Sequence, residues 1–195
     1  HSRDSINGAG QDLISNVHYG EDYDNAFWDS YDEQMVYGDY HGWPLAHDVV
    51  AHEITHGVTS HESNLFYYYQ SGAISESLSD LWGEFVDLTN GAGNDAPGVR
   101  WLVGEDISGL GAIRDMENPP TYGDPDKITS PNFITGGCYD LKDTTTWCDY
   151  GWVHYNSGVN NKAVFLMTDG GTFNGHTVSG LGIDKVADIY YRAAT

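Results

Sequence analysis

The segment His52-Glu53-Ile54-Thr55-His56 constrains this chain more than any other feature of its sequence. Two histidines four positions apart on an α-helix are separated by about 40° of rotation, so both imidazoles project from one face. Together they can chelate one metal ion, and the glutamate between them lies close enough to act on a water molecule at that ion. The segment therefore predicts a helix that carries a metal site.

The sequence around this segment supports a helix and predicts a second one. The apolar residues of the stretch 46–61 fall on helical spacing: Val49, Val50, Ile54 and Val58. The stretch 72–89 carries another apolar stripe, formed by Ile74, Leu78, Leu81, Trp82, Phe85 and Leu88. We therefore expect two helices joined by an aromatic connector over residues 65–69.

The second helix offers a third metal ligand. Zinc in a catalytic site usually takes three protein ligands and one water molecule. Between His56 and Glu76 there are 19 residues, enough for a connector and an antiparallel return. Asp80 lies one turn beyond Glu76, where its carboxylate can accept the free ring N–H of a ligand histidine. Two acids on a solvated helix face are the alternative interpretation.

Composition limits the class of protein. The 195 residues are enough for one good-sized domain or two small lobes, and a hydrophobic content of 39% argues against disorder. There are 8 Lys and Arg against 29 Asp and Glu, which gives a net charge of −21. This charge repels nucleic acids and anionic membranes, so we expect neither as a partner. It suits an extracellular protein that binds calcium, although a solvated acidic surface also accounts for most of these residues.

The two cysteines, Cys138 and Cys148, are separated by nine residues and lie in no zinc-binding pattern. A disulfide that closes this loop is the expected use, and two free thiols are the alternative. The sequence has no apolar run of the roughly 20 residues that a membrane span needs, and no signal-peptide pattern at its start. If the protein is secreted, we expect its targeting segment to have been removed.

Elsewhere the sequence predicts a strand at Gln34–Tyr37, a loop-rich stretch from 91 to 147, and helices at about 157–168 and 183–193. The last helix places Val186, Ile189 and Tyr190 at helical spacing, as a stripe that we expect to be buried. The stretch from 1 to 39 otherwise reads as turns or a short helix.

Motifs spread over nearly the whole length resemble the thermolysin family of zinc metalloendopeptidases. Besides the segment 52–56 they are Asn25–Trp28, Met35–Asp39, Ser71–Ile74 with Glu76, Gly104–Asp106, Tyr122–Pro125 and Val153–Gly158. The resemblance implies a zincin-like α+β fold with a short β-containing N-terminal part, an active-site helix, and a mainly helical part with long loops. Residues 1–60 would be a remnant of the N-terminal lobe plus the metal-binding helix. Residues 61–195 would form the helical lobe, with the third zinc ligand, a calcium site and His154.

The resemblance also implies residue roles. By similarity the zinc ligands are His52, His56 and Glu76, and Glu53 is the general base. Tyr67 and His154 match the side chains that stabilise the oxyanion, and Asp149 matches the acid that hydrogen-bonds this histidine. The residues that match the substrate-binding positions are Arg114, for a backbone carbonyl, and Asn25 and Ala26, for the strand edge. The family's pocket is apolar, and the candidates for its lining are Val49, Ile113 and Val103.

A structural calcium ion is a further expectation. Asp48, Asp87 and Glu105 match carboxylate ligands of the family, and Glu84 is a plausible addition. Arg100 and Leu102 stand where members with two calcium ions carry acids. We therefore expect one calcium ion at most, with the backbone carbonyl of Leu102 as a further ligand.

The predicted function is that of a secreted zinc endopeptidase that cleaves peptides or proteins on the amino side of bulky apolar residues. From the resemblance we expect that most of the family's first lobe and all of its last helices lie outside this sequence. We therefore expect exposed apolar surface at both ends, covered by those segments or by a second copy. An aminopeptidase is the alternative enzyme, and a non-catalytic, zinc-binding fragment of such a protease is the alternative from another class.

Overall fold

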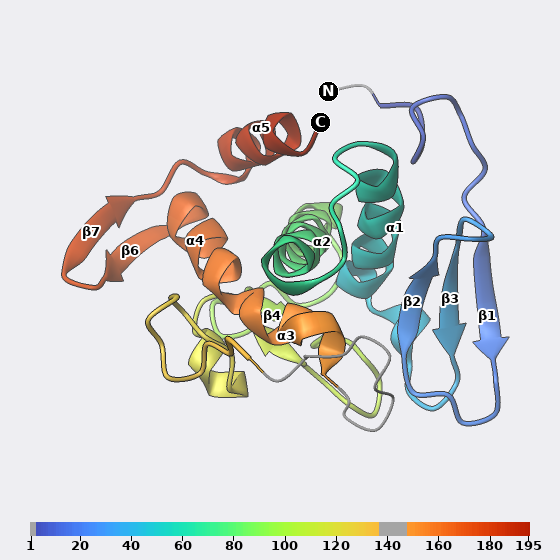
Figure 1. The fold of residues 1–195 in the computed structure, drawn as a ribbon, viewed down its shortest axis with the longest axis horizontal. Helices are drawn as coiled ribbons and strands as arrows, with labels where there is room; N and C mark the ends of the chain where they lie inside the picture. Colours follow the sequence, from blue (N-terminus) through green and yellow to red (C-terminus); the bar gives the residue numbers. More distant parts are fainter. Residues whose placement is uncertain (1–2, 137–147) are drawn as a thin grey trace.

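The computed structural model describes residues 3–136 and 148–195. Helices α1 (His47–His61) and α2 (Tyr69–Asn90) lie side by side at its centre (Figure 1). A small sheet packs against α1, and the remaining helices pack against α2. The α+β class and the order of its parts agree with the sequence-based expectation.

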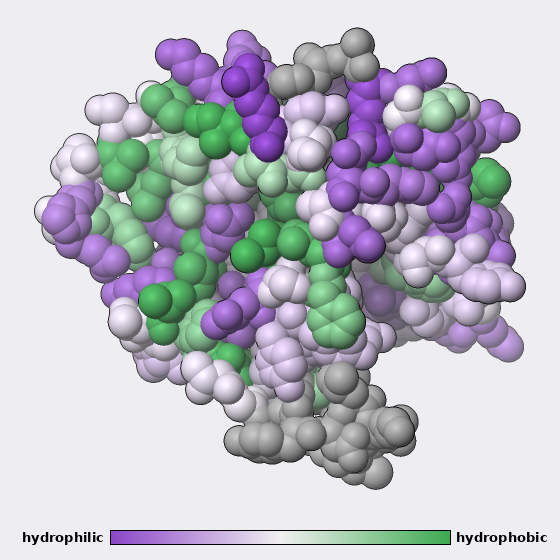
Figure 2. Space-filling view, turned by 45° about the horizontal axis from the view of Figure 1, so that its top comes forward, coloured by the Kyte–Doolittle hydropathy of each residue, from purple (hydrophilic) through white to green (hydrophobic). Residues whose placement is uncertain are grey.

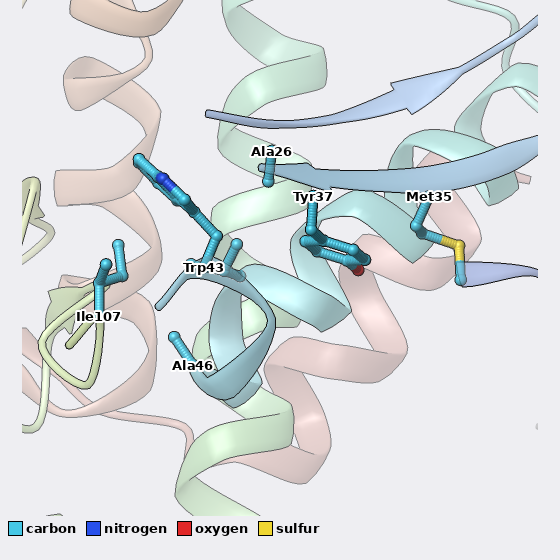
Figure 3. Packing of buried hydrophobic residues seen from close by; sticks show 7 residues of the cluster. Ala26, Met35, Tyr37, Trp43, Ala46 and Ile107 are labelled. Carbon is cyan, nitrogen blue, oxygen red and sulfur yellow. The ribbon is translucent and has the colours of Figure 1, made fainter. Parts of the chain in front are cut away.

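The sheet contains three strands, β1 (Ser15–Tyr19), β2 (Ala26–Asp29) and β3 (Gln34–Gly38), in the order β1-β3-β2. The central strand β3 runs parallel to β1 and antiparallel to β2. Its apolar side chains are buried against the start of α1, in a core that consists of Ala26, Met35, Tyr37, Trp43, Ala46, Val49 and Ile107 (Figure 3). The sequence pattern predicted β3 alone, because the apolar residues of β1 are exposed and β2 has only four residues.

Helices α1 and α2 approach each other closely because Gly83 lies between them. A Cβ atom at this glycine would stand 2.7 Å from the backbone oxygen of Asp48, a distance that real Cβ atoms do not adopt. Helix α2 ends at Gly91, which takes a left-handed conformation with φ of 74°. The short distance between the two helix backbones lets side chains of moderate length meet across this interface.

A second core connects α2 to the rest of the helical part. It contains residues of α2, of β4 (Leu102–Val103), of α4 (Gly158–Thr168) and of α5 (Ile183–Ala194). Strand β4 pairs with β5 (Arg114–Asp115) in a two-stranded antiparallel sheet. Its buried members are Leu81, Phe85, Trp101, Val103, Met116, Val164 and Val186. Asp169, just after α4, binds the Arg100 guanidinium at 2.9 and 3.0 Å and the Trp101 ring nitrogen at 2.8 Å. These contacts hold α4 against the loop before β4.

Besides β1, β2, β4 and β5, four elements that follow β5 were not predicted from the residues. They are η2 (Pro119–Tyr122), α3 (Asp149–Asn156) and the hairpin β6 (Gly170–Phe173) and β7 (His176–Ser179). The hairpin is polar, glycine-rich and mostly exposed, so it shows no alternating apolar pattern. A 3-10 turn, η1 (Trp43–Leu45), leads into α1. Cys138 lies outside the described residues, so its pairing with Cys148 stays a prediction.

Apolar side chains also reach the surface. Figure 2 shows several of them in green among polar groups on one face. A groove of about 800 Å³ lies between α1, α2 and the end of α5, and its apolar lining includes Val50, Ile54, Leu78, Trp82 and Val86. This groove agrees with the expectation of exposed apolar surface, whereas the partner that would cover it stays a prediction. Within the described residues, no helix is both long enough and apolar enough to cross a membrane.

Candidate metal centre and cleft

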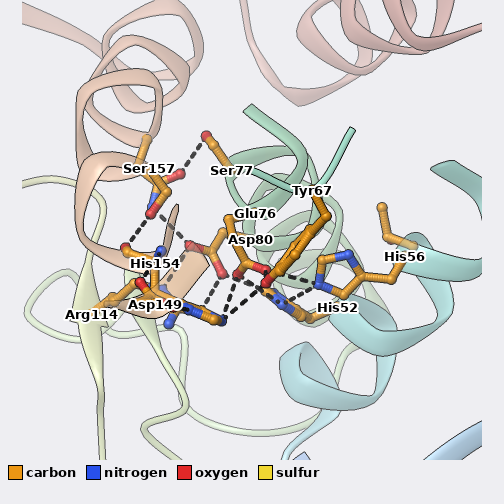
Figure 4. Close-up of polar contacts among 12 residues, drawn as sticks. His52, His56, Tyr67, Glu76, Ser77, Asp80, Arg114, Asp149, His154 and Ser157 are labelled. Atoms are coloured by element: carbon orange, nitrogen blue, oxygen red, sulfur yellow. Dashed lines mark hydrogen bonds and ion pairs between the residues drawn. The ribbon is translucent and has the colours of Figure 1, made fainter. Parts of the chain in front are cut away.

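Helix α1 brings His52 and His56 to its face toward α2, one turn apart, as their spacing predicted. His52 is 7% exposed, and the Nε2 atoms of the two rings lie 3.1 Å apart (Figure 4). The predicted third ligand, Glu76, is fully buried near the start of α2. Its Oε1 lies 3.2 Å from Nε2 of His56, and its Oε2 lies 3.4 Å from Nε2 of His52.

These three side chains therefore form one cluster whose ligand atoms all lie within 4.8 Å of one another. Two imidazole nitrogens and one carboxylate oxygen are donor types that zinc prefers in catalytic sites. The Oε2 atom of Glu76 is buried without a hydrogen-bond partner among the described residues. An unpartnered buried carboxylate oxygen is costly, and a cation between the three side chains would satisfy it. The residues present thus fit a divalent metal ion.

Charge around Glu76 favours its ionised form. Burial by itself would raise the pKa of Glu76, but the imidazoles of His154 and His56 outweigh burial and hold this pKa well below its ordinary value. A deprotonated carboxylate is the form that binds a metal.

Asp80 lies one turn after Glu76 on α2 and supports His52, as the spacing predicted. Its Oδ1 is 2.9 Å from Nδ1 of His52. Arg114, on β5, donates to the same carboxylate through two nitrogens, at 2.8 and 2.5 Å. Although Asp80 is fully buried, the guanidinium and the imidazole lower its pKa below the ordinary value. Arg114 also borders the cleft, so the predicted substrate-binding arginine is fixed by an acid beside the metal cluster.

His154 and Tyr67 reach the same cluster from other elements. Nε2 of His154 lies 3.3 Å from Glu76 Oε2, and the Tyr67 hydroxyl donates to Glu76 Oε1 while it lies 3.4 Å from this nitrogen. Asp149 accepts from His154 at both the backbone nitrogen, at 2.9 Å, and the ring Nδ1, at 2.5 Å. Burial opposes the charged ring, but the two acids outweigh burial and raise the pKa of His154.

An unusual backbone turn places Asp149. At the start of α3, the residues Asp149, Tyr150, Gly151 and Trp152 have positive φ angles of 47°, 50°, 94° and 65°. Non-glycine residues adopt this region at a cost of roughly 1–2 kcal/mol each. The turn folds the Asp149 carboxylate back onto the ring and the backbone of His154. A run of left-handed residues has no apolar periodicity, so sequence patterns did not indicate it.

A cleft of about 690 Å³ opens over the metal cluster. The predicted residues that line it are Asn25, Ala26, Val49, Glu53, Tyr67, Ile113, Arg114 and His154. Glu53 is only 6% exposed, and burial raises its pKa in spite of the two neighbouring imidazoles. Three tyrosines at the rim, Tyr23, Tyr68 and Tyr150, were not predicted. The ring centroid of Tyr150 lies 5.4 Å from those of Tyr67 and Tyr68, and only the aromatic run 66–69 pointed to this region.

The residues predicted for calcium form a second cluster, at the start of α1. Carboxylate oxygens of Asp48, Glu84 and Glu105 lie within 4.8 Å of one another. Burial and the surrounding acids raise the pKa of Glu84 well above its ordinary value and that of Glu105 to about 8. Asp87 is buried nearby but outside this trio, 3.7 Å from Nδ1 of His47. Leu102, in β4, is half-buried, and its carbonyl as a calcium ligand stays a prediction.

One oxygen of Glu84 and one of Glu105 are buried without hydrogen-bond partners among the described residues. The Asp48 carboxylate, in contrast, accepts from the backbone nitrogens of Val49, at 2.8 Å, and Gly104. Oxygen-only donor sets suit a hard cation such as calcium.

Comparison with known proteins agrees with this geometry. Residues 1–60 match the family described as "Thermolysin metallopeptidase, catalytic domain", and residues 63–195 match "Thermolysin metallopeptidase, alpha-helical domain". The chain is 43% identical to a bacillolysin of Bacillus cereus over 100% of its own length and 32% of that protein. It is 46% identical to a zinc metalloproteinase of Renibacterium salmoninarum over 87% of its length and 29% of that protein.

A solved structure, the precursor of protealysin, a metalloproteinase from Serratia proteamaculans, superposes with a TM-score of 0.69 at 31% identity. The match covers 98% of this chain and 58% of that one. The chain thus spans about a third of the length of the curated relatives that it matches. Two family matches that together cover almost every residue, with the metal cluster where they meet, place this chain in the thermolysin metallopeptidase family.

Proposed function

We propose that this protein is a secreted, zinc-dependent endopeptidase that hydrolyses peptide bonds on the amino side of bulky hydrophobic residues. The observation that carries the proposal is the convergence of His52, His56 and Glu76 at the floor of a cleft. Secretion is supported by the net charge of −21, which suits a calcium-containing extracellular medium.

Zinc, when bound by His52, His56 and Glu76, supplies Lewis acidity, which polarises a peptide carbonyl and makes water more acidic. The chain's own residues then do the proton chemistry. Glu53 borders the cleft, and burial raises its pKa, so its carboxylate is a competent acceptor for a proton from water. The same group can pass this proton to the leaving amine.

Charge that develops on the carbonyl oxygen needs hydrogen-bond donors. Tyr67 and His154 border the cleft next to Glu76 and can supply an O–H and an N–H. Raised pKa values keep both groups protonated: burial and then Glu76 raise that of Tyr67, and the two nearby acids raise that of His154. Asp149 fixes the orientation of the His154 ring through its contact at Nδ1.

Substrate binding is proposed for the edge of the sheet and for an apolar wall. Strand β2 is the outer strand on the side that borders the cleft, so the backbone at Asn25 and Ala26 can pair with an extended peptide. Val49 and Ile113 line the cleft and provide apolar surface for a bulky side chain. The preference for apolar residues rests on this lining together with family membership.

A calcium ion at Asp48, Glu84 and Glu105 completes the proposal. The three acids would otherwise bury two unpartnered oxygens and repel one another. Asp87 and the carbonyl of Leu102 are proposed as outer contributors. Arg100 is paired with Asp169, and this cation near the loop supports one ion rather than two.

The test is the variant Glu53→Gln, assayed with a denatured protein substrate and with a peptide that is blocked at both ends. We expect the variant to keep its zinc, measured by elemental analysis, and to lose at least about 100-fold in kcat/KM, since general-base catalysis contributes this much or more. Glu62→Gln, at the end of α1 and away from the cluster, is the matched control.

Two outcomes would contradict the proposal. An inert starting protein that still binds zinc would favour a non-catalytic zinc-binding fragment. Activity only on peptides with a free N-terminus would favour an aminopeptidase. Cleavage of the blocked peptide that stops with a chelator and returns with zinc would support the endopeptidase.

A further inference from the structure

A chain of hydrogen bonds, buried near the metal cluster and partly buried farther out, leads from this cluster to the last helix. It begins at Asp80, whose Oδ2 accepts from the side-chain nitrogen of Asn161 at 2.8 Å. The hydroxyl of Ser77 donates to the Asn161 oxygen at 2.5 Å, and the side-chain nitrogen of Asn160 donates to this hydroxyl at 2.9 Å. The chain ends on α5, where the Tyr190 hydroxyl donates to the Asn160 oxygen at 3.2 Å.

The direction of these bonds follows from the chemistry of each group. An ionised Asp80 only accepts, so Asn161 must present its NH2 group to it and turn its oxygen toward Ser77. Ser77 has a single proton, and because Asn161 takes it, Asn160 must donate to Ser77. The Asn160 oxygen then faces Tyr190, which donates to it. One arrangement of protons therefore satisfies every member.

This chain completes the hydrogen bonding of Asp80. Oδ1 accepts from Nδ1 of His52 and from the terminal nitrogen of Arg114. Oδ2 accepts from Nε of Arg114 and from Asn161. Four donors thus occupy the roughly four lone-pair positions of one carboxylate. A carboxylate held from four directions cannot turn, so it keeps the His52 proton on Nδ1 and leaves the lone pair of Nε2 directed at the cluster.

The burial of Ser77, Asp80 and Asn161 indicates that these polar residues serve to orient the Asp80 carboxylate. Ser77 and Asp80 are fully buried, and Asn161 is 1% exposed (Figure 4 shows Ser77 and Asp80 beside the cluster). Helices pack at least as well through apolar side chains, and buried polar groups add stability only when they are fully satisfied. Here they are satisfied, and their common end point is a carboxylate that orients a metal-ligating histidine.

We infer that Asn161, Ser77, Asn160 and Tyr190 form a positioning relay for the metal centre, which couples α4 and α5 to His52 through Asp80. The inference rests on the proposed function, because it takes His52 as a zinc ligand. The effect on zinc affinity decreases with distance from Asp80: it is largest for Asn161, smaller for Ser77 and smallest for Tyr190.

The experiment measures the zinc dissociation constant of Asn161→Leu, Ser77→Ala and Tyr190→Phe in the full chain, by competition with a chromophoric chelator. Contacts behind a metal ligand typically change affinity by about 10- to 100-fold. We expect values in this range for Asn161→Leu and Ser77→Ala, and a change of about threefold for Tyr190→Phe. The thermal unfolding midpoint of the metal-free protein is measured for every variant.

Ser79→Ala is the matched control. Ser79 is also fully buried on α2, two positions from Ser77, and its hydroxyl has no hydrogen-bond partner among the described residues. If zinc affinity falls in Ser77→Ala but not in Ser79→Ala, at similar metal-free unfolding midpoints, the relay is supported. Equal zinc affinities in the two variants would overturn it.

A double-variant cycle separates the relay from general packing. In an Asp80→Asn background the relay has no ionised carboxylate to orient, so adding Ser77→Ala should not weaken zinc binding further. A full additional loss in this background would overturn the inference. The proposed function fails separately, if the unmodified protein binds zinc but cleaves no peptide, and failure of the unmodified protein to bind zinc would overturn both.

Discussion

The interface between α1 and α2 holds two clusters of acids, and the clusters behave in opposite ways. Along α2, Glu76, Asp80, Glu84 and Asp87 follow one another at helical spacing and all are buried on one side. The pKa values of Glu76 and Asp80 are lowered, whereas those of Glu84 and Asp87 are raised. The surroundings of a single helix face therefore lower the pKa of the acids at its beginning and raise the pKa of those towards its end.

Burial does not explain this difference, since none of the four is more than 4% exposed. The neighbours do. Glu76 and Asp80 face three imidazoles and the guanidinium of Arg114. The strongest influences on Glu84, after burial, are the like charges of Asp48 and Glu105. The zinc-type cluster is thus organised by the protein's own cations, while the oxygen-rich cluster needs protons or a metal ion to offset its charge.

The first prediction concerns Glu76, because it is a proposed zinc ligand and its carboxylate faces three imidazoles. Glu76→Gln should weaken zinc binding by more than the roughly 10- to 100-fold that is typical of contacts behind the ligands. It should also destabilise the metal-free protein, since the imidazoles lose their counter-charge. Elemental analysis and thermal unfolding measure the two effects. Unchanged zinc content in Glu76→Gln would contradict the role of Glu76 in the zinc-type cluster.

The second prediction concerns Glu84, in the oxygen-rich cluster towards the end of α2. Without divalent cations, Glu84→Gln should stabilise the protein above about pH 5 by about 1–2 kcal/mol, because it removes an acid that the folded protein must either keep protonated or bury as a repelled charge. The sign follows from the raised pKa: the protonated acid is the favoured form in the folded protein, and its contribution is lost as the pH rises through the folded-state pKa.

Calcium should then make the unmodified protein more stable than Glu84→Gln, the reverse of their order in chelator. At 100 times its dissociation constant, a bound ion adds about 2.7 kcal/mol to the unfolding free energy. We expect this gain for the unmodified protein and little of it for Glu84→Gln, as measured by denaturant unfolding with calcium or with a chelator. A variant that is less stable than the unmodified protein in chelator would contradict the account.

A smaller effect is expected for Asp124, which lies near the zinc-type cluster but has a raised pKa, unlike Glu76 and Asp80. Asp124 is buried and faces Arg114, yet burial raises the pKa of its carboxyl to about 7. Its protonated form stabilises the folded protein below about pH 4, and this contribution is lost as the pH rises to about 7. One unit of pKa shift corresponds to about 1.4 kcal/mol, so Asp124→Asn should be more stable than the unmodified protein at pH 8 by about 1 kcal/mol or more.

The measurement for Asp124 is the unfolding free energy as a function of pH, with exposed Asp184→Asn as the control. The difference between Asp124→Asn and the unmodified protein should appear between pH 4 and 7. If the two curves stay parallel over this range, the effect of the nearby cations on the pKa of Asp124 outweighs the effect of burial. Asp124 would then follow the same rule as Glu76 and Asp80.

Local sequence determined a large part of this protein. The spacing of His52 and His56 required a helix with both rings on one side, and the apolar stripe of α2 indicated the helix that carries Glu76 and Asp80. These predictions succeeded because helical periodicity is a property of neighbouring residues and needs no distant contact. The roles of Tyr67, Arg114 and Asp149 were indicated by family resemblance, since a tyrosine in an aromatic run or a lone arginine has no local pattern.

Only the tertiary structure decided in which direction the pKa of each buried acid shifts and which groups contact it. The approach of α1 to α2 at Gly83 and the relay from Tyr190 to Asp80 join residues far apart in sequence. The left-handed turn that brings Asp149 to His154 spans only five positions, but it follows no sequence pattern. The pKa of a buried acid depends on which charges fold around it, and the sequence of α2 alone does not specify them. The sequence therefore determined the ligand types and the helices that carry them, while three-dimensional packing determined their charge and orientation.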